Sequence, residues 1–252
     1  MRIEGRNAVL EALRSGVKVR RALLLRGIKS SKNIDEILAH LSQQNIVAEY
    51  VQRSDLDRKS DHAAHQGVMI WTAAFEFASL GSIIASTKDA TDALVVVLDH
   101  VTDPGNLGAI ARSAEVFGAA GLIVAKDRAA ALTPAAHKAA AGALAHLPVV
   151  QVTNISRALQ QLKEAGFWIA GASEHATDNV WDTQLSGKIA VVMGAEDKGL
   201  SRLVKENCDF LVRLPQSGKV GSLNVAQATT ALLYEYIRQT AERTRRSISV
   251  SG

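Results

Sequence analysis

Hydrophobic and polar residues follow two different rhythms along the chain. Over residues 1–73, short apolar runs such as ALLL alternate with stretches such as NIDEILAHLSQQN, whose apolar residues recur at helical spacing. Gly16 closes the first helical stretch, and Asn33 stands where it would cap the second. The pattern predicts a small α/β domain with helices at 5–16 and 33–45 and strands at 22–25, 47–51 and 67–73.

From residue 94 the apolar runs become longer. ALVVVL and IAVVM are almost continuously apolar, which is typical of parallel strands covered on both faces. Among the helical patterns between such runs, ISRALQQLKEA is the clearest, with Asn154 as its cap and Gly166 at its end. The second part is predicted as a parallel α/β sheet, with strands at 94–99, 121–125, 148–152, 167–171, 189–194 and 210–214 and helices at 107–118, 134–145, 155–165, 199–207 and 223–240.

The residues between these two parts follow neither rhythm. SLGSIIASTKDATDA is small and polar with one apolar pair, which predicts a linker that contains one helical turn. The predicted organisation is therefore a domain at 1–73, a linker at 74–93, a second domain at 94–240 and a basic, flexible tail at 241–252.

Composition narrows the class of protein. The 252 residues are 47% hydrophobic, which is enough for one large domain or two small ones with separate cores. No apolar run approaches the length of a membrane span, and the first residues, MRIEGRNAVLEAL, lack the apolar centre of a signal peptide. The single cysteine, Cys208, excludes an internal disulfide and a Cys-rich zinc site. These observations predict a cytoplasmic protein with no membrane partner.

The charge is mildly positive, at +4, with a pI of about 9.3. Positive residues are concentrated in RSGVKVRR at 14–21 and in RTRR at 243–246. A nucleic-acid partner would explain this distribution, and so would a solvated surface with a frayed terminus. The charge alone leaves both interpretations open.

Candidate chemistry lies in three loops that follow predicted strands, namely HVTDPGNLGAIAR, GAEDKGL and PQSGKVGSLNVA. Loops at the carboxyl ends of parallel strands line one crevice, and glycine lets their backbone approach a ligand. The set contains no His or Cys cluster suited to metal hydrolysis or to a nucleophilic triad. It is suited to binding a phosphate, orienting a hydroxyl and holding a cationic cofactor, through Asn106, Arg112, Glu196, Ser222 and Asn224.

A purely structural interpretation exists for several of these residues. Asn106 would accept a positive φ in a turn after Pro-Gly, and Asn224 would cap the last helix. Glu196 would cap the helix that follows it. Ser222 and Asn224 are harder to explain in this way, because they flank a leucine directly before a long apolar helix. Three such loops at strand ends together favour a functional site.

The three segments DPGNLGAIARSAEVFGA, VMGAEDKGLS and LPQSGKVGSLNVA, in this order and spacing, resemble the three motifs of SpoU/TrmH-type RNA ribose 2′-O-methyltransferases of the SPOUT superfamily. The resemblance covers residues 94–240. The first domain, with GRNAVLEAL and HQGV, resembles the L30e-like RNA-binding domain of the members that act on large-subunit rRNA. The nearest resemblance is to the RlmB group, which methylates a guanosine in 23S rRNA.

The resemblance implies properties that the hydrophobic pattern alone does not predict. The fold would carry a deep trefoil knot from about residue 189 through the final helix, and the protein would be a homodimer. The methyl donor would be S-adenosylmethionine, without a metal ion. Arg112 would activate the ribose hydroxyl, Asn106, Glu196, Ser222 and Asn224 would shape the site, and Gly194, Leu214 and Leu223 would bind the donor.

The resemblance also assigns other features of the chain. His62 and His65 are expected at the surface or facing RNA. Two departures from the family pattern are Ala226, where many relatives have Ser, and His100, where they often have Gly or Asn. The apolar residues of the final helix would form the dimer interface or the core, namely Val225, Leu232, Leu233, Tyr236 and Ile237.

Three alternatives are weighed against this assignment. A tRNA methyltransferase of the same family is the nearest, although tRNA-directed members often lack the N-terminal domain. An rRNA-binding assembly protein without catalysis is another, against which the complete set of five polar residues argues. A dinucleotide oxidoreductase is disfavoured, because no strand is followed by G-x-G-x-x-G.

Overall fold

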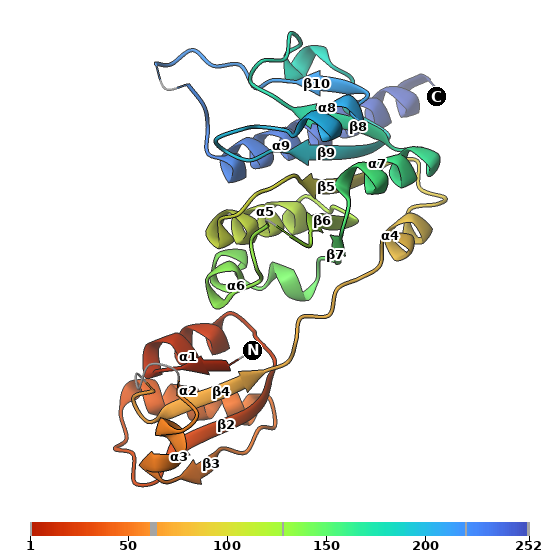
Figure 1. The fold of residues 1–252 in the computed structure, drawn as a ribbon. Coiled ribbons are helices and arrows are strands. Elements are labelled where there is room, and N and C mark those ends of the chain that lie inside the picture. The colour runs from red at the N-terminus through yellow and green to blue at the C-terminus, as the bar shows by residue number, and fades with distance from the viewer. Residues whose placement is uncertain (1, 61–64, 128, 220, 251–252) are drawn as a thin grey trace.

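The computed structural model describes residues 2–60, 65–127, 129–219 and 221–250, which form two α/β domains, one following the other along the molecule (Figure 1). The first contains a four-stranded sheet in the order β1-β4-β2-β3, in which β2 and β3 are parallel and the other pairs antiparallel. Its elements are β1 (Arg2–Glu4), α1 (Arg6–Arg14), β2 (Val19–Leu25), α2 (Lys32–Gln43), β3 (Glu49–Val51), α3 (Arg53–Asp57) and β4 (Val68–Thr72).

The helices α1 and α2 cover one face of this sheet, and their buried residues, such as Leu13 and Ile37, pack on Leu24 and Ile70. The predicted helices and strands of this domain are confirmed, whereas β1 and α3 are short elements that the pattern missed. The prediction of Asn33 as a cap is wrong. The helix starts earlier, after Ser31, so the Asn33 amide is free to donate to Asn7 Oδ1 at 2.9 Å.

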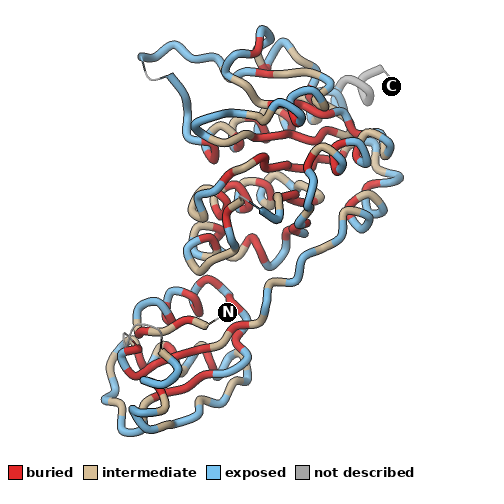
Figure 2. Tube along the Cα trace, viewed as in Figure 1, coloured by how far each residue is buried: buried red, intermediate tan, exposed pale blue. Residues whose placement is uncertain are grey.

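The second domain is built on six parallel strands in the order β10-β8-β9-β5-β6-β7. This confirms the predicted parallel α/β sheet, and Figure 2 shows its central strands buried. The strands are β5 (Ala93–Leu98), β6 (Gly121–Ala125), β7 (Val149–Val152), β8 (Trp168–Ala172), β9 (Lys188–Met193) and β10 (Phe210–Val212). The helices are α4 (Leu80–Ser86), α5 (Pro104–Val116), α6 (Pro134–Ala140), α7 (Ile155–Glu164), α8 (Arg202–Glu206) and α9 (Val225–Val250), with short 3₁₀ turns at Ala143–Ala145 and Val180–Asp182.

Alternate residues of β5 serve two separate cores, because successive side chains of a strand point to opposite faces. Val96 and its even-numbered neighbours pack with α5, α6 and α9. Val95 and Val97 pack with α4, α7 and α8 on the other face. Both faces are therefore covered, as the continuous apolar runs predict.

Several predicted helix boundaries are corrected. Asp103 caps α5 by accepting from the Asn106 N–H, so this helix begins at Pro104 and not at 107. The predicted helix at 134–145 ends at Ala140, because Ala141 and Gly142 take positive φ values of 48° and 95°.

Two further boundaries differ towards the end of the chain. The predicted helix at 199–207 is shortened to α8, and the one at 223–240 is lengthened to residue 250, through most of the segment predicted as a tail. In contrast, Asn154 caps α7 and Gly166 follows its end with φ 85°, as predicted.

The predicted linker contains part of the second core. Within it, α4 is a seven-residue helix, and Ala78 forms a parallel bridge with Val150 at the sheet edge. Ile83 of α4 is 1% exposed and packs on the sheet beside Gly121, where a Cβ atom would lie 2.1 Å from Ile83 Cδ1. Ile83 therefore occupies space that is available only because residue 121 is a glycine.

The two domains meet at α1 and α6. Lys138 Nζ lies 2.6 Å from Glu11 Oε1 across this junction, and the Phe75 ring packs edge-on against Phe77 and His137. Burial lowers the pKa of His137, so its imidazole stays neutral in this aromatic cluster at neutral pH. In the described part of the chain, no helix has the length and apolar character needed to cross a membrane.

The substitution Ile83→Ala is expected to lower the free energy of unfolding by about 2–5 kcal/mol, because the cavity beside Gly121 cannot collapse onto a smaller side chain. Urea denaturation followed by circular dichroism measures the loss. Ile84→Ala removes the same atoms from a half-buried position and should cost less. Equal losses for the two variants would contradict the burial of α4 on the sheet.

Candidate active site

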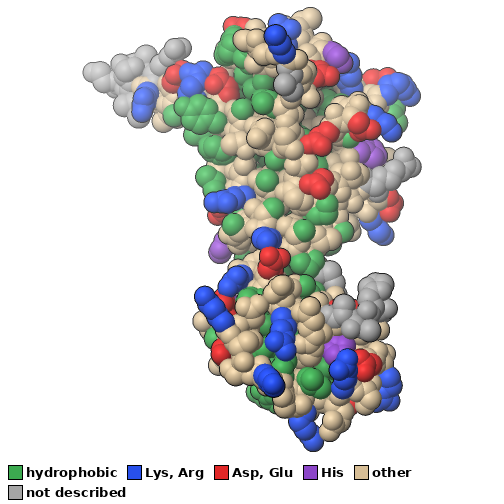
Figure 3. All heavy atoms as spheres, turned by 90° about the vertical axis from the view of Figure 1, so that its left-hand side faces the viewer, with side chains coloured by type: hydrophobic (Ala, Val, Ile, Leu, Met, Phe, Trp, Pro, Cys, Tyr) green, Lys and Arg blue, Asp and Glu red, His purple; other side chains and the backbone are tan. Residues whose placement is uncertain are grey.

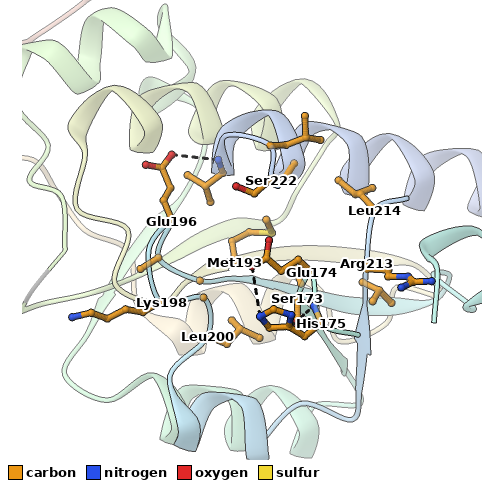
Figure 4. A pocket seen from close by; sticks show the side chains of 18 of the residues that line it. Ser173, Glu174, His175, Met193, Glu196, Lys198, Leu200, Arg213, Leu214 and Ser222 are labelled. Atoms are coloured by element: carbon orange, nitrogen blue, oxygen red, sulfur yellow. Dashed lines mark hydrogen bonds and ion pairs between the residues drawn. The ribbon is translucent and has the colours of Figure 1, made fainter. Parts of the chain in front are cut away.

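The loops after β8, β9 and β10 and the start of α9 surround one cavity of about 260 Å³ at the carboxyl edge of the sheet (Figure 4). Its apolar walls include Met193, Leu200 and Leu214. Figure 4 shows these side chains around the cavity, with Ser222 and Glu196 at the side nearest the start of α9. A mixed pocket of this kind suits a ligand with an apolar ring and polar ends.

All three residues predicted to bind the donor, Gly194, Leu214 and Leu223, line this cavity. Gly194 is required by close packing, since a Cβ atom there would lie 2.2 Å from the Gly199 carbonyl carbon. The backbones of Ala195 and Gly199 also exchange two hydrogen bonds, which hold the loop in a tight turn. Contact between these residues and a donor stays a prediction.

Three of the five predicted polar residues form one hydrogen-bonded network. Asn106 Nδ2 donates to Glu196 Oε1 at 2.9 Å, and Asn224 Nδ2 lies 2.8 Å from the same oxygen and 2.9 Å from Asn106 Oδ1. The Val225 N–H also points at Glu196 Oε1, at 3.4 Å. Residues more than a hundred positions apart in the sequence are thereby joined at the carboxyl edge.

The network decides between the interpretations that the sequence left open. Asn224 does cap α9, because its Oδ1 accepts from the Ala226 N–H at 2.9 Å, and its Nδ2 still reaches Glu196. Asn106 lies inside α5 and does not occupy a positive-φ turn. Glu196 bonds to the two asparagines, while Ser201 takes the cap position of α8. The capping role and the network coexist only at Asn224.

Arg112 and Ser222 are not part of the network. Ser222 is exposed and lines the cavity. Arg112 is exposed on α5, and within the described residues its side chain makes no hydrogen bond or ion pair. Six helical positions separate it from Asn106, which turns its side chain about 120° around the helix axis. Arg112 therefore points away from the network of its own chain.

A buried carboxylate ties the first loop to the second. Asp99, at the end of β5, is 1% exposed, and its Oδ2 accepts from the Ser201 N–H at 2.6 Å. Its Oδ1 lies 2.6 Å from His100 Nδ1. His100 has a φ of 62°, in the left-handed region that favours Gly and Asn. A histidine is less easily accommodated in this conformation than Gly or Asn, and the bond to Asp99 helps hold it there.

One wall of the cavity was not predicted from the sequence. Ser173, Glu174 and His175 follow β8 and line it (Figure 4). The His175 N–H donates to Ser173 Oγ at 3.3 Å, and His175 Nε2 lies 3.6 Å from Glu174 Oε1. The signal was present, because this loop also follows the carboxyl end of a parallel strand, but it lacks the glycines that marked the other three.

Other reactive groups serve the fold. Burial raises the pKa of the Cys208 thiol to about 12, so it stays protonated at neutral pH and is not a nucleophile. The prediction that His65 lies at the surface is wrong, since it is 4% exposed. Its Nδ1 accepts from the Gly67 N–H, and its Nε2 meets Asp57 Oδ1 at 2.9 Å. His62 lies outside the described residues. Among those residues no group of His, Cys, Asp or Glu side chains is arranged to hold a metal ion.

Comparison with known proteins gives the class. The family model described as the SpoU rRNA Methylase family matches residues 93–234, and the model for RNA 2′-O ribose methyltransferase substrate binding matches residues 2–78. A protein of Staphylococcus haemolyticus assigned to the TrmH family of tRNA/rRNA methyltransferases is 39% identical over 238 residues, covering 94% of this chain and 95% of the relative. The chain belongs to the SpoU/TrmH family of RNA methyltransferases.

Solved structures agree with this assignment. The SpoU methyltransferase AviRb from Streptomyces viridochromogenes, in complex with the cofactor AdoMet, is similar with a TM-score of 0.69 and 28% identity, covering 95% of this chain and 89% of AviRb. An RNA 2′-O ribose methyltransferase is similar with a TM-score of 0.63 and 26% identity, covering 95% of this chain and 88% of the other.

The conformation at His100 gives a stability prediction. His100→Val is expected to lower the free energy of unfolding by about 1–2 kcal/mol, because a β-branched residue is strained at φ 62°. His100→Asn also gives up the imidazole but tolerates the left-handed region, so it should lose less. Chemical denaturation of both variants compares them directly, and equal stability would contradict a role for the backbone conformation.

Proposed function

We propose that the protein transfers a methyl group from S-adenosylmethionine to a ribose 2′-oxygen of RNA, with a guanosine in 23S rRNA as the target. The observation that carries this proposal is the network of Asn106, Glu196 and Asn224 beside a cavity lined by Gly194 and Leu214. AviRb, which is similar over nearly the whole chain, holds AdoMet in its solved structure. The methyl donor therefore fits a pocket with this chemistry.

The residues present fit the donor. When bound, S-adenosylmethionine supplies a methyl group made electrophilic by the sulfonium centre. Met193, Leu200 and Leu214 form apolar walls for its adenine, and the glycine at 194 lets backbone groups approach its edge. Glu196 gives the pocket a carboxylate that attracts a cationic group. Asn106 and Asn224 hold that carboxylate in one orientation before substrate arrives.

In the reaction, the ribose 2′-oxygen attacks the methyl carbon in line with its bond to sulfur. The new O–CH₃ bond forms as the S–CH₃ bond breaks, the electron pair stays on sulfur, and the hydroxyl proton leaves to solvent. The enzyme contributes alignment and a more nucleophilic oxygen. A guanidinium is a poor general base, so the part of Arg112 is to bind the phosphate beside the target and to orient the hydroxyl.

Arg112 acts in a homodimer in this proposal, where it reaches the cavity of the partner protomer. Its own network lies on another face of α5, while the face that carries Arg112 continues into exposed apolar side chains. These are Val116 on α5, 67% exposed, and Tyr234 and Ile237 on α9, 59% and 38% exposed. Ser113 and Thr230 join the two helices through their hydroxyls at 2.7 Å, so the face is continuous. A second copy of the chain is the proposed occupant.

The apolar residues of α9 divide between the core and this face. Val225, Leu232, Leu233 and Tyr236 are buried in the protein's own core, so they do not form an interface. Of the five residues considered from the sequence, Ile237 alone is exposed. Its neighbour on the surface is Tyr234, which was not among the five residues predicted from the sequence.

The trefoil knot is also part of the proposal. The segment from residue 189 through α9 supports it, because the chain leaves β10 at the edge of the sheet and returns to the middle of the carboxyl edge, where Asn224 meets Glu196. A crystal structure in which this segment passes beside the preceding loop, without threading it, would contradict the knot.

The choice of 23S rRNA rests on the N-terminal domain. Residues 2–78 match the substrate-binding model of RNA 2′-O ribose methyltransferases, and the Staphylococcus haemolyticus relative is described for both tRNA and rRNA. A tRNA substrate is therefore the competing proposal, and it differs only in the RNA that is methylated.

Labelled methyl transfer from S-adenosylmethionine to unmodified 23S rRNA and to bulk tRNA tests the function, with nucleoside analysis of the product. Label in 2′-O-methylguanosine of rRNA is the expected result. Arg112→Ala should reduce the rate at least about 100-fold, because an orienting and activating group is lost. Arg202→Ala removes another exposed arginine, which pairs with Glu206, and should leave the rate unchanged.

The alternatives give distinct outcomes in the same experiment. Label in tRNA alone supports the competing substrate. RNA binding without transfer, together with no binding of S-adenosylmethionine, supports a non-catalytic RNA-binding protein. Full activity of Arg112→Ala in a folded protein contradicts the assigned role of Arg112.

The proposed dimer has its own test. The wild-type chain of 26.9 kDa should sediment at twice that mass, and Ile237→Asp should shift it to the monomer, because a carboxylate would be buried in the interface. Leu203→Asp changes an exposed leucine on α8, on the other face of the sheet, and should leave the dimer intact. A monomeric wild-type protein with full activity would refute the contribution of Arg112 across protomers.

A further inference from the structure

The excess positive charge of the chain belongs entirely to the first domain. Residues 1–73 contain 12 Lys and Arg against 8 Asp and Glu, and residues 74–252 contain 17 of each sign. Figure 3 shows Lys and Arg side chains gathered over the lower, N-terminal domain. An electrostatic contact with an RNA backbone is therefore concentrated on this domain and not around the cavity.

One face of the four-stranded sheet is only partly covered. The opposite face is filled by α1 and α2, whereas this one is covered by α3 through Leu56, which packs on Leu23 and Met69. Beyond α3 the same face continues to Trp71 of β4, which is half-buried at the margin of that small core. The Trp71 ring thus lies at the boundary between the part of this face that α3 covers and the part that is exposed to solvent.

Two arginines flank Trp71 in register. Arg2 of β1 and Arg21 of β2 are the direct cross-strand partners of Trp71, so all three side chains point to this face. The Arg21 guanidinium lies over the Trp71 ring, 5.8 Å from its centroid. This arrangement places a planar cation against an aromatic face at a solvent-accessible edge.

Arg21 is held in place by Glu49 of β3. Its Nε and a terminal nitrogen bond to the two Glu49 oxygens at 2.8 and 2.7 Å. The bond from Arg21, with a smaller contribution from nearby Lys59, lowers the pKa of Glu49, which keeps the carboxylate ionised. An exposed ion pair adds little stability, so its main effect is to fix the guanidinium plane before a ligand arrives.

A β-bulge adds a second cation to the same region. The register of β2 against β4 shifts between Val19 and Arg21, so Arg20 is the extra residue. Alternation is interrupted there, and both Arg20 and Arg21 are exposed. Within the described residues Arg20 makes no ion pair, so its charge is available to a phosphate.

We propose that Arg20, Arg21 and Trp71 form a stacking platform that captures an unpaired base of the RNA substrate. The base stacks on the Arg21–Trp71 pair, and Arg20 contacts an adjacent phosphate. Unstacked bases are recognised in this way by aromatic and guanidinium planes, whereas a duplex keeps its bases inside. This inference rests on the proposed function, since it assigns a substrate surface about one domain away from the cavity.

Binding of a fluorescein-labelled 12-nucleotide oligoadenylate, compared with a blunt 12-base-pair RNA duplex, tests the platform in the full chain. The single strand should bind more tightly. Trp71→Leu should weaken its Kd about ten-fold, in the range expected for one stacked base, while Trp71→Phe keeps most of the affinity. Trp168→Leu, which alters an exposed tryptophan of the other domain, should have no effect.

Two arginine variants separate stacking from charge. Arg21→Lys keeps the positive charge but removes the planar guanidinium, so it should weaken binding of the single strand and not of the duplex. Arg20→Ala should weaken the binding of both RNAs. It should also reduce the slope of log Kd against log salt concentration by about one, because one phosphate contact is lost. These variants also keep the test valid if Trp71→Leu unfolds the domain in a thermal melt.

Unchanged single-strand affinity of Trp71→Leu and Arg21→Lys, or equally tight binding of duplex and single strand by the wild type, would overturn the platform. Methyl transfer by the wild type is measured in parallel. If the wild type transfers methyl groups and the platform variants keep its single-strand affinity, the platform is refuted and the proposed reaction stands. Loss of RNA binding in the variants without transfer by the wild type removes the proposed reaction and leaves the platform standing.

Discussion

One carboxylate oxygen, Oε1 of Glu196, connects three parts of the chain that the fold brings to the carboxyl edge of the parallel sheet. It accepts from Asn106 at the start of α5 and from Asn224 and the Val225 N–H at the start of α9. Asp99 plays a similar part below it, since its buried carboxylate holds the Ser201 N–H of the loop after β9. A carboxylate accepts several donors at once, and this capacity lets two acidic residues fix the relative positions of the loops that line the cavity.

The parts of the fold that the sequence predicts are those whose signals are local. ALVVVL and IAVVM are buried strands, and Asn154 and Gly166 bound a helix, because each signal lies within a few residues. Asn106, Glu196 and Asn224 meet because parallel strands carry their loops to the same edge.

The features that the sequence did not predict depend on distant neighbours or on backbone conformation. Ile83 is buried because Gly121 leaves room for it, although α4 lies in a polar segment. The hydrogen bonds of His65 to Gly67 and Asp57 exist only after the first domain has folded. Arg112 follows Asn106 closely in sequence yet faces elsewhere, because a helix turns about 100° per residue. The loop at 173–175 was not predicted as part of the site because these three residues include no glycine.

The order of the strands has a consequence for how the molecule is made. Its two central strands, β5 and β9, pair along their whole length but come from residues 93–98 and 188–193. A ribosome releases β5, β6 and β7 well before β9, so β5 waits with one edge unpaired while about ninety further residues are synthesised. Contacts between such distant residues slow folding, because a long loop must close first. The nascent domain thus exposes an apolar central strand until β9 is synthesised, and that interval is when the chain most needs protection from aggregation.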